Sequence, residues 1–231
     1  RTTAIMINTP NNPTGVVYTK EELEGLAQLC IRHDIWIISD EVYEKLIYED
    51  AVHVSLASIS KEAWNRTVTI NGCSKNYAMT GWRLGYAAFM KKMRGMQGHI
   101  TSGVNAISQK AAVEAIGGPQ ESVEKMKNEF DRRRIMMYKK LCDIPGITLV
   151  SAEGAFYLLP DVSSYFGKTW GKGVIHDSCD MAEYLLEKAK VAVVPGDGFR
   201  APGCLRLSYS NSYEKLSEGI ERIEEALKEL K

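Results

Sequence analysis

Residues 4–39 read AIMINTPNNPTGVVYTKEELEGLAQLCIRHDIWIIS, and this stretch decides the fold. Two short apolar runs, at 4–8 and 35–39, stand at its ends, and a charged segment with helical periodicity separates them. Apolar runs of this length, bounded by turn residues, are typical of strands buried in a sheet. Strand, helix and strand within about 35 residues form a βαβ unit, which predicts a parallel sheet covered by helices on both faces.

The segment between the two predicted strands carries its own start signal. Thr19 and Glu22 have the spacing of a capping box, in which each side chain accepts a hydrogen bond from the backbone of the other residue. Leu23, Leu26 and Cys30 then recur at the spacing of one helical face. We therefore expect an amphipathic helix that begins near Thr19 and packs its apolar face on the sheet.

Further apolar patterns divide the rest of the chain. A third strand is predicted at 67–71 and a candidate fourth at 84–90. A long helix that is charged on one side is predicted at 120–141. After Pro145 and Gly146 the apolar pattern predicts short strands and helices, which is typical of a smaller α+β domain. The short strands are expected at 147–150, 155–159, 191–194 and 205–208. We expect one domain over 1–118 and a linking helix with a small C-terminal domain over 119–231.

The last helical pattern, at 213–227, carries an apolar stripe on one side. Packing of this stripe on its own domain is favoured, and a coiled-coil interaction is the alternative for a stripe this short.

Composition excludes several classes of protein. The chain has 231 residues, of which 45% are hydrophobic, and its 29 basic residues balance 29 acidic ones, so no net field favours nucleic acid or an anionic membrane. No apolar run approaches the ~20 residues of a membrane span. The five cysteines show no C-x-x-C pair, which indicates free thiols and a cytoplasmic location, and the four histidines have no metal-ligand spacing. We expect no metal site. Because the chain begins with Arg1 rather than methionine, we also expect residues upstream of it.

Polar clusters follow three of the predicted strands. They are Asn11–Gly15 after the first, Asp40–Tyr43 after the second and Cys73–Lys75 after the third. Ligands of open α/β sheets bind at the carboxyl ends of the strands, so these clusters are predicted to converge on one crevice. Taken singly, an asparagine in a turn, an aspartate at a helix start or a lysine in a loop has an ordinary structural role.

The motifs NNPTG, SDEVY, SKNYAMTGWRLGY and RLSYS occur in this order along the chain. In order and interval they resemble the class I/II aminotransferases, which are fold-type I pyridoxal-phosphate enzymes, and within them the aspartate aminotransferase-like branch. The resemblance covers essentially all 231 residues, which are similar to the C-terminal part of the family's chain. It implies part of a mostly parallel three-layer αβα sandwich followed by a smaller α+β domain, a homodimer, and amino transfer between an amino acid, with aspartate as one candidate, and a 2-oxo acid.

The resemblance also implies roles for single residues in binding pyridoxal 5'-phosphate. Lys75 would bind the cofactor covalently and move the substrate's proton, which requires its amine to be unprotonated. Asp40 would pair with the pyridine nitrogen, and Tyr43 and Asn12 would donate hydrogen bonds to the ring's phenolate oxygen. Arg83 would hold the phosphate through its planar fork of donors.

The phosphate contact departs from the family's pattern at one position. Ser74 is expected to assist Arg83, because Gly72 stands where many relatives carry a hydroxyl residue.

Substrate contacts are implied for Arg206, Asn12 and Phe156. Arg206 lies in an apolar strand pattern, where a buried arginine needs an anionic partner, and the family uses this position to hold the substrate α-carboxylate. A structural ion pair is the alternative for Arg206. Other chemistry on the same scaffold, such as that of a C–S β-lyase or a decarboxylase, stays open, as does a non-catalytic aminotransferase-like domain of a transcription regulator.

Overall fold

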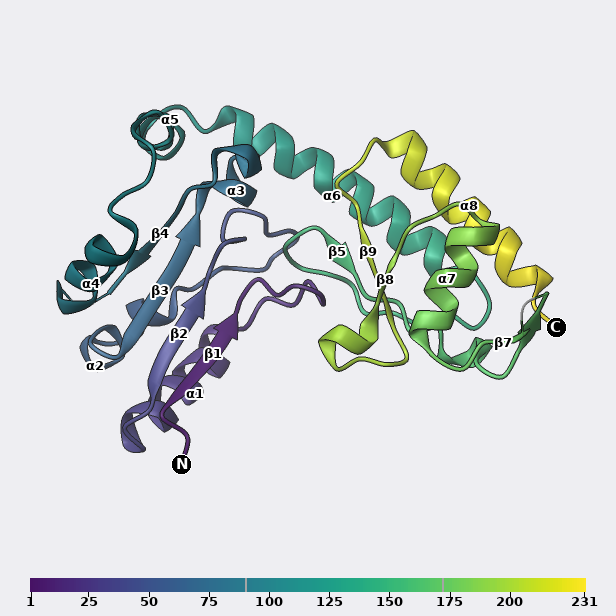
Figure 1. Cartoon of the computed structure of the whole chain (residues 1–231), viewed down its shortest axis with the longest axis horizontal. Coiled ribbons are helices and arrows are strands. Elements are labelled where there is room, and N and C mark those ends of the chain that lie inside the picture. The colour runs from purple at the N-terminus through teal and green to yellow at the C-terminus, as the bar shows by residue number, and fades with distance from the viewer. Residues whose placement is uncertain (90, 172) are drawn as a thin grey trace. The chain divides into compact units, whose positions relative to one another are not determined.

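A computed structural model describes residues 1–89, 91–171 and 173–231, and the chain divides into two compact units (Figure 1). The first unit consists of Arg1–Asn12, Val16–Lys127 and Glu153–Ala155, and the second of Pro13–Gly15, Asn128–Ala152 and Phe156–Lys231. The chain passes from one unit to the other within helix α6 (Glu121–Cys142), which corresponds to the predicted long helix. The domain boundary expected between 118 and 119 stays a prediction.

Four strands form the sheet of the first unit, in the order β1-β2-β3-β4 (Figure 1). They span Ala4–Asn8, Trp36–Asp40, Thr67–Gly72 and Gly85–Ala88. β1, β2 and β3 are parallel, which confirms the βαβ unit predicted from residues 4–39. β4 confirms the candidate fourth strand over a shorter range and runs antiparallel to β3. Met90, at the end of that predicted run, lies outside the described residues.

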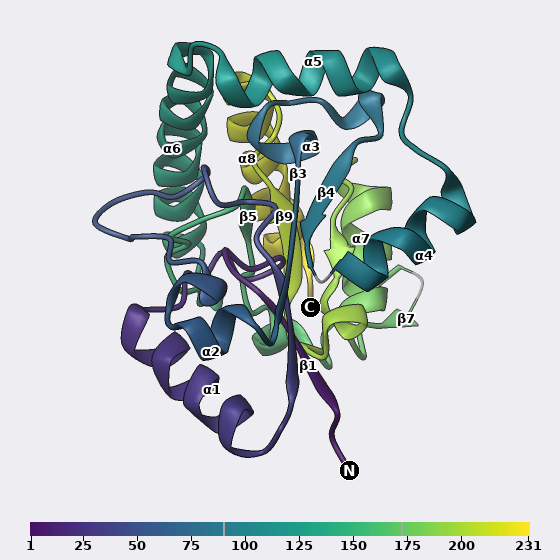
Figure 2. The same cartoon turned by 90° about the vertical axis from the view of Figure 1, so that its left-hand side faces the viewer.

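Helix α1 (Lys20–Arg32) connects β1 to β2 and begins as predicted. The Thr19 Oγ1 accepts from the N–H of Glu22 at 3.2 Å, and the Glu22 Oε2 accepts from the N–H of Thr19 at 2.8 Å, so both halves of the capping box are present. The apolar face of α1 joins β2, the short helix η1 (Leu56–Ser58) and helix α2 (Lys61–Trp64) in one core, with α1 and α2 on the same side of the sheet (Figure 2). The buried members of this core are Leu23, Ala27, Cys30, Ile37, Leu56 and Ala63.

The opposite face of the sheet is partly exposed in the part of the chain that the structure describes. Met6, Trp36 and Ile70 belong to this face and are 69%, 38% and 37% exposed. Burial alternates along β2, where Ile37 and Ser39 are buried and Trp36 is exposed. On the side that α1 and α2 cover, Ile37 of β2 lies beside Thr67 of β3, and both are buried.

Short elements complete the first unit around the end of β3. They are η1 (Leu56–Ser58), α3 (Cys73–Asn76), η2 (Thr80–Trp82), α4 (Lys91–Thr101) and α5 (Ala106–Gly117). Cys73, Met79, Leu84 and Ala112 form a second apolar cluster, so α5 packs on the loop that contains α3 and η2. Buried contacts thereby fix the turn that directly follows β3.

The second unit contains a small sheet of order β5-β9-β8 and two helices that follow α6. Its elements are β5 (Tyr157–Leu158), η3 (Ser163–Tyr165), β6 (Thr169–Trp170), β7 (Gly173–Val174), α7 (Ser178–Lys188), β8 (Val194–Pro195), η4 (Gly196–Phe199), β9 (Leu205–Ser208) and α8 (Tyr213–Glu229). The strand predicted at 205–208 is confirmed. The strand predicted at 155–159 is shorter and forms β5, and the one predicted at 191–194 overlaps β8 only at Val194. The prediction of a strand at 147–150 is wrong, because Thr148 forms only an isolated bridge to Asp161.

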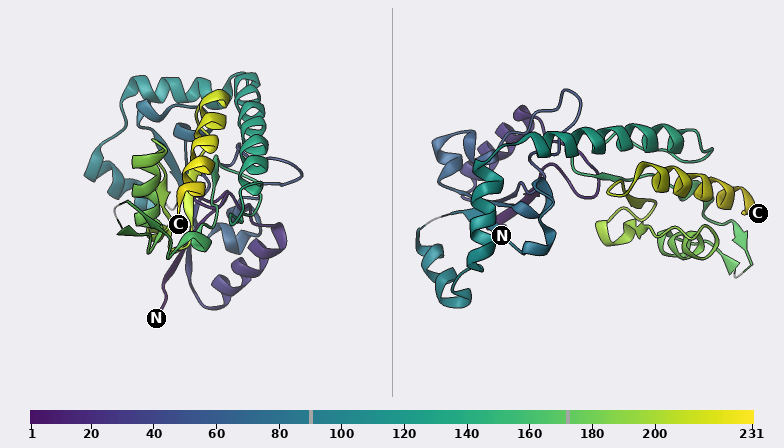
Figure 3. Two further views of the ribbon diagram at one scale, coloured as in Figure 1. Left: turned by 90° about the vertical axis from the view of Figure 1, so that its right-hand side faces the viewer. Right: turned by 90° about the horizontal axis from the view of Figure 1, so that it is seen from above.

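Helix α8 packs within its own unit, as expected from its apolar stripe. Ile220, Ile223 and Leu227 are buried, and the Tyr184 hydroxyl of α7 donates to the carbonyl of Ala226 at 2.6 Å. α8 also runs beside the second half of α6 (Figure 3), where the Nζ of Lys140 donates to the Ser217 hydroxyl. Among the residues that the structure describes, no helix has the length and apolar character needed to cross a membrane.

Candidate active site

The carboxyl ends of the three parallel strands lie at one edge of the sheet in the first unit, and β3 extends beyond the other two by Asn71 and Gly72. Asn8 at the end of β1 is in register with Asp40 at the end of β2, and Asp40 is in register with Ile70 of β3. The hydrogen-bond ladder continues past the strands, because the N–H of Thr9 donates to the Asp40 carbonyl at 3.1 Å and the N–H of Glu41 to the Ile70 carbonyl at 2.9 Å. The three polar clusters therefore leave the sheet at one edge, as predicted.

Asp40 is the last residue of β2, and its side chain is half-buried. Its Oδ1 accepts a hydrogen bond from the N–H of Val42 at 3.2 Å. Burial raises the pKa of Asp40 above its ordinary value, the Val42 hydrogen bond opposes this rise, and the charge of Glu41 adds to it. A nearby cation stabilises the ionised form of such a carboxyl group.

Hydrogen bonds between asparagines hold the segment that follows β1. The Asn8 Oδ1 accepts from the N–H of Asn12 at 2.8 Å, and the Asn8 Nδ2 donates to the Asp40 carbonyl at 3.0 Å. Asn8 thereby ties the start of the Asn12 loop to the end of β2, a role that sequence reasoning missed. Tyr43 follows Asp40 by three residues and is buried, with 4% of its surface exposed.

Lys75 lies in α3, a single turn that follows β3 directly, and both Lys75 and Ser74 are half-buried. Gly72 precedes the turn and is in register with Gly85 of β4. A Cβ atom on Gly72 would lie 3.3 Å from the Cα of Gly85 and 3.3 Å from the carbonyl oxygen of Leu84. The two glycines therefore allow β3 and β4 to approach closely where the chain turns into the segment that carries Lys75.

Arg83 ends the η2 turn with an exposed side chain. Its backbone is left-handed, with φ 51°, and its Nη1 donates to the carbonyl of Thr80 at 2.9 Å. This bond folds the guanidinium back over its own turn, within the same loop as Lys75.

The two candidate substrate residues of the second unit belong to an aromatic cluster. Arg206 on β9 is half-buried rather than buried, and its guanidinium carbon lies 4.6 Å from the ring centroid of Tyr157 and 5.0 Å from that of Phe199. Both are cation–π distances. The Phe156 ring stacks on Phe130 with centroids 5.5 Å apart. Ring contacts therefore orient both residues, which the sequence did not predict.

A family model described as aminotransferase class I and II matches residues 1–223. The chain belongs to the class I and II aminotransferases. It is 48% identical over 232 residues to an aspartate aminotransferase of Bacillus sp. (strain YM-2), with 99% of this chain and 58% of that relative covered. It is 49% identical over 236 residues to a probable aspartate/prephenate aminotransferase of Aquifex aeolicus, with 100% and 58% covered.

A solved structure of similar fold comes from the same family. The crystal structure of the aspartate aminotransferase from Rhizobium meliloti matches with a TM-score of 0.95 at 38% identity, over 100% of this chain and 59% of that one. The resemblance and the fold class are thereby confirmed. The chain spans about 58% of the length of the curated relatives that it matches.

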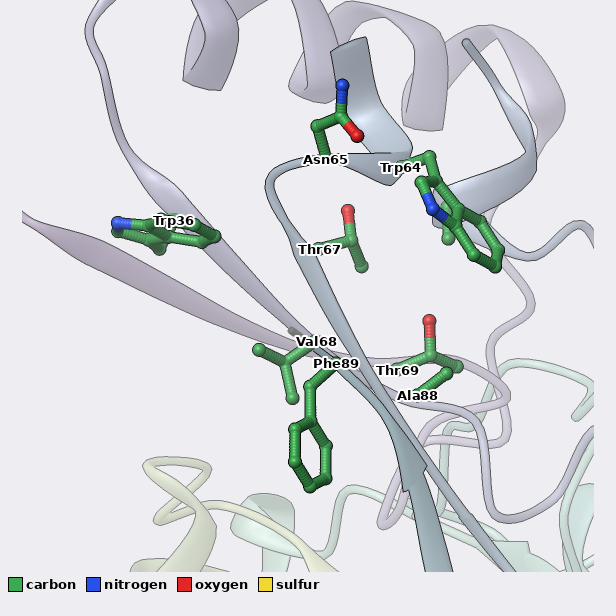
Figure 4. A pocket seen from close by; sticks show the side chains of 9 residues that line it. Trp36, Trp64, Asn65, Thr67, Val68, Thr69, Ala88 and Phe89 are labelled. Carbon is green, nitrogen blue, oxygen red and sulfur yellow. The ribbon is translucent and has the colours of Figure 1, made fainter. Parts of the chain in front are cut away.

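The cavity shown in Figure 4 lies away from the candidate site of this aminotransferase chain. It has a volume of about 300 Å³ and is found where β2 and β3 begin and β4 ends. Its lining residues are Trp36, Ala57, Trp64, Asn65, Thr67, Val68, Thr69, Ala88 and Phe89. None of them is a predicted site residue; those of the first unit lie at or beyond the opposite ends of the parallel strands, and Phe156 and Arg206 belong to the second unit.

Two buried charged residues of the aminotransferase chain were not predicted. Glu41, next to Asp40, is 2% exposed. Arg134 of α6 is also 2% exposed, and its guanidinium pairs with Asp131 at 2.8 Å and donates to the carbonyl of Ala152 at 3.1 Å. Arg134 thus joins α6 to the segment that leads into Phe156.

Proposed function

We propose that this chain is part of a pyridoxal-phosphate-dependent aminotransferase that moves an amino group between an amino acid and a 2-oxo acid. The observation that carries the proposal is the edge shared by the carboxyl ends of β1, β2 and β3, which the polar clusters around Asn12, Asp40 and Lys75 follow. Open α/β sheets bind ligands at this edge. An amide, a carboxyl group, a phenol and an amine form the donor set that a phosphorylated pyridine aldehyde requires.

The residues of the first unit fit this cofactor. Asp40 is half-buried, and a protonated pyridine nitrogen would supply the nearby cation that stabilises its ionised form. Tyr43 and Asn12 would donate to the phenolate oxygen, and Arg83 with Ser74 would hold the phosphate. When bound, pyridoxal 5'-phosphate supplies an electron sink for the negative charge that develops at the substrate α-carbon.

The remaining roles concern the substrate. Lys75 would attach the cofactor, and its freed amine would then take the proton from the substrate α-carbon and return it as an acid. Arg206 would bind the substrate α-carboxylate through its planar fork, with its direction supported by the rings of Tyr157 and Phe199. Phe156 and Asn12 would complete the substrate contacts.

Reductive trapping tests the assignment of Lys75. Borohydride reduction of the full-length holoprotein followed by peptide mass spectrometry is expected to find the pyridoxyl label on Lys75. The label should disappear in Lys75→Arg and persist in Lys45→Arg, a matched change at a half-buried lysine whose Nζ lies 5.9 Å from the Tyr77 ring centroid. Recovery of the label on another lysine would overturn the assignment.

The reaction itself is tested by comparing products. Aspartate and prephenate are the first substrates to assay, because the relatives are named for them. Transfer that depends on a 2-oxo acid supports the proposal, whereas release of ammonia with pyruvate identifies a β-lyase. Binding of the cofactor with no turnover of any amino acid identifies a regulatory domain.

Arg206 has its own kinetic test. Arg206→Ala is expected to lower kcat/KM for the amino acid by an amount equivalent to about 2–5 kcal/mol, because the α-carboxylate loses a charged, bidentate partner. Arg222→Gln, which removes an exposed arginine of α8 that pairs with Glu218, is the matched control and should leave kcat/KM unchanged. Equal values for both variants would assign Arg206 to a structural role.

We also propose that the full-length protein is a cytoplasmic homodimer. The five cysteines are free thiols, which supports a reducing compartment. Ile107 and Val113 of α5 are 76% and 70% exposed, which supports burial of this helix in the assembled protein. Light scattering of the full-length protein should give twice the mass of one chain, and a monomer mass would refute the dimer.

A further inference from the structure

A polar cluster lies beneath the end of β2, on the face of the sheet that α1 and α2 cover. Its centre is the buried carboxylate of Glu41. The Oε1 of Glu41 accepts from the hydroxyls of Ser39 and Ser55, each at 2.9 Å, and from the N–H of Leu56 at 3.3 Å. Its Oε2 lies 3.2 Å from the Nε2 of His53. Four contacts therefore hold one carboxylate in place.

The backbone of Glu41 is fixed as firmly as its side chain. Its N–H donates to the Ile70 carbonyl at 2.9 Å, and its carbonyl accepts from the N–H of Glu44 at 2.9 Å. Successive side chains of a strand point to opposite faces, so Glu41 continues the buried row of Ile37 and Ser39 while Asp40 points the other way. Movement of Glu41 would consequently tilt the Asp40 carboxyl group.

Stability alone does not account for a carboxylate at this place. The adjoining core of α1, α2 and β2 is apolar, and a well-packed apolar side chain is often as stabilising as a buried ionic group or more so. His53 contacts the cluster through its Nε2 alone, since its buried Nδ1 has no hydrogen-bond partner in the described part of the chain. Both oxygens of the Glu41 carboxylate do have partners, and a buried polar group whose partners are in place specifies one arrangement of the backbone.

We propose that Glu41 is a positioning residue, which together with His53 and Ser55 fixes the direction of the Asp40 carboxyl group toward the cofactor's pyridine nitrogen. The inference rests on the proposed function of Asp40. Glu41 itself lies on the opposite face and acts through its neighbour rather than on the cofactor. Loss of its contacts therefore weakens cofactor binding only as long as residue 40 is an aspartate.

A double-mutant cycle on the full-length protein tests this dependence, with the dissociation constant of pyridoxal 5'-phosphate as the readout. Asp40→Asn is expected to weaken binding by tenfold or more, and Glu41→Gln by about tenfold, the scale of groups that orient a ligand's direct contacts. Glu41→Gln in the Asp40→Asn background should change binding less than twofold. Glu62→Gln, at an exposed glutamate of α2, is the matched control and should bind like the wild type.

Each outcome of the cycle decides one assignment. If Asp40→Asn binds the cofactor as tightly as the wild type, the proposed role of Asp40 is wrong and the role of Glu41 falls with it. If Glu41→Gln weakens binding equally in both backgrounds, Glu41 is merely structural and Asp40 keeps its role. Should Glu41→Gln fail to fold, Ser55→Ala removes a single donor and must show the same dependence on Asp40, with a weakening of about threefold expected from one hydrogen bond.

Discussion

Replacement of Gly72 by alanine tests whether close approach of β3 and β4 positions the turn that carries Lys75. The new Cβ atom would meet the backbone of Gly85 and Leu84, each at 3.3 Å. Neither neighbour can yield easily, because Gly72 and Gly85 are paired in the ladder and the Leu84 carbonyl accepts from the N–H of Cys73 at 3.3 Å, which is already long.

The size of the effect follows from two opposing terms. Overpacking of this kind costs about 1–3 kcal/mol. The φ of Gly72 is −174°, which alanine adopts without strain. The lower conformational entropy of the unfolded alanine variant therefore stabilises the folded state by about 0.4–1 kcal/mol. We expect Gly72→Ala to lower the free energy of unfolding by about 0.5–2 kcal/mol, and to weaken cofactor binding because the turn after β3 shifts.

Urea unfolding of the full-length apoprotein measures the first effect and cofactor titration the second. Gly81→Ala is the matched control, because a Cβ there meets nothing within 4 Å, and it should be as stable as the wild type or more so. A Gly72→Ala variant with unchanged stability and cofactor affinity would refute the reasoning. Gly72→Ser carries the same Cβ, so its affinity relative to Gly72→Ala isolates what a hydroxyl group adds at this position.

Three further predictions concern stability. Arg134→Met should lower the free energy of unfolding by about 3 kcal/mol in urea denaturation, because the ion pair with Asp131 breaks and the buried Ala152 carbonyl loses a donor. A loss below about 1 kcal/mol would contradict the stabilising role of this buried pair. Asp40→Asn should raise the melting temperature of the apoprotein near neutral pH, since a raised pKa means that the folded state disfavours the ionised carboxylate. That gain should vanish as the pH falls below the ordinary aspartate pKa of 3.8, where the carboxyl group is protonated in both states, and a gain that persists there argues against the assignment. Thr19→Ala should cost about 1 kcal/mol in thermal unfolding through loss of the α1 cap, and no change would show that the cap is dispensable.

Local signals account for the parts of the fold that the sequence predicted well. The capping box of Thr19 and Glu22 and the apolar period that follows it depend on residues a few positions apart, and the structure reproduces both. The direction of β4 was not predicted, although only residues 73–84 separate it from β3. A parallel connection needs a dozen residues or more, usually as a helix, and these twelve residues form the short turns α3 and η2 instead of a crossover helix.

The polar features that were missed had weaker signals. Glu41 lies two residues after Ser39 and four after Ile37, so the period of a strand places all three on one face. Arg134 interrupts the apolar stripe of α6 between Phe130 and Met137, at helical spacing from each. A charged residue inside an apolar period is therefore a usable sign of a buried network, but its partners, such as Ser55 or Ala152, come from distant segments and require the fold.

The partly exposed face of the sheet also provides an optical probe. Trp36 stands on that face with 38% of its surface in contact with water, and an indole emits at shorter wavelength when protein replaces this water. Whatever part of the full-length protein comes to lie against β1 and β2 should shift the Trp36 emission to the blue. Fluorescence of Trp36→Phe and wild-type samples, in full-length and 231-residue forms, would therefore show without any added label whether another segment covers this face.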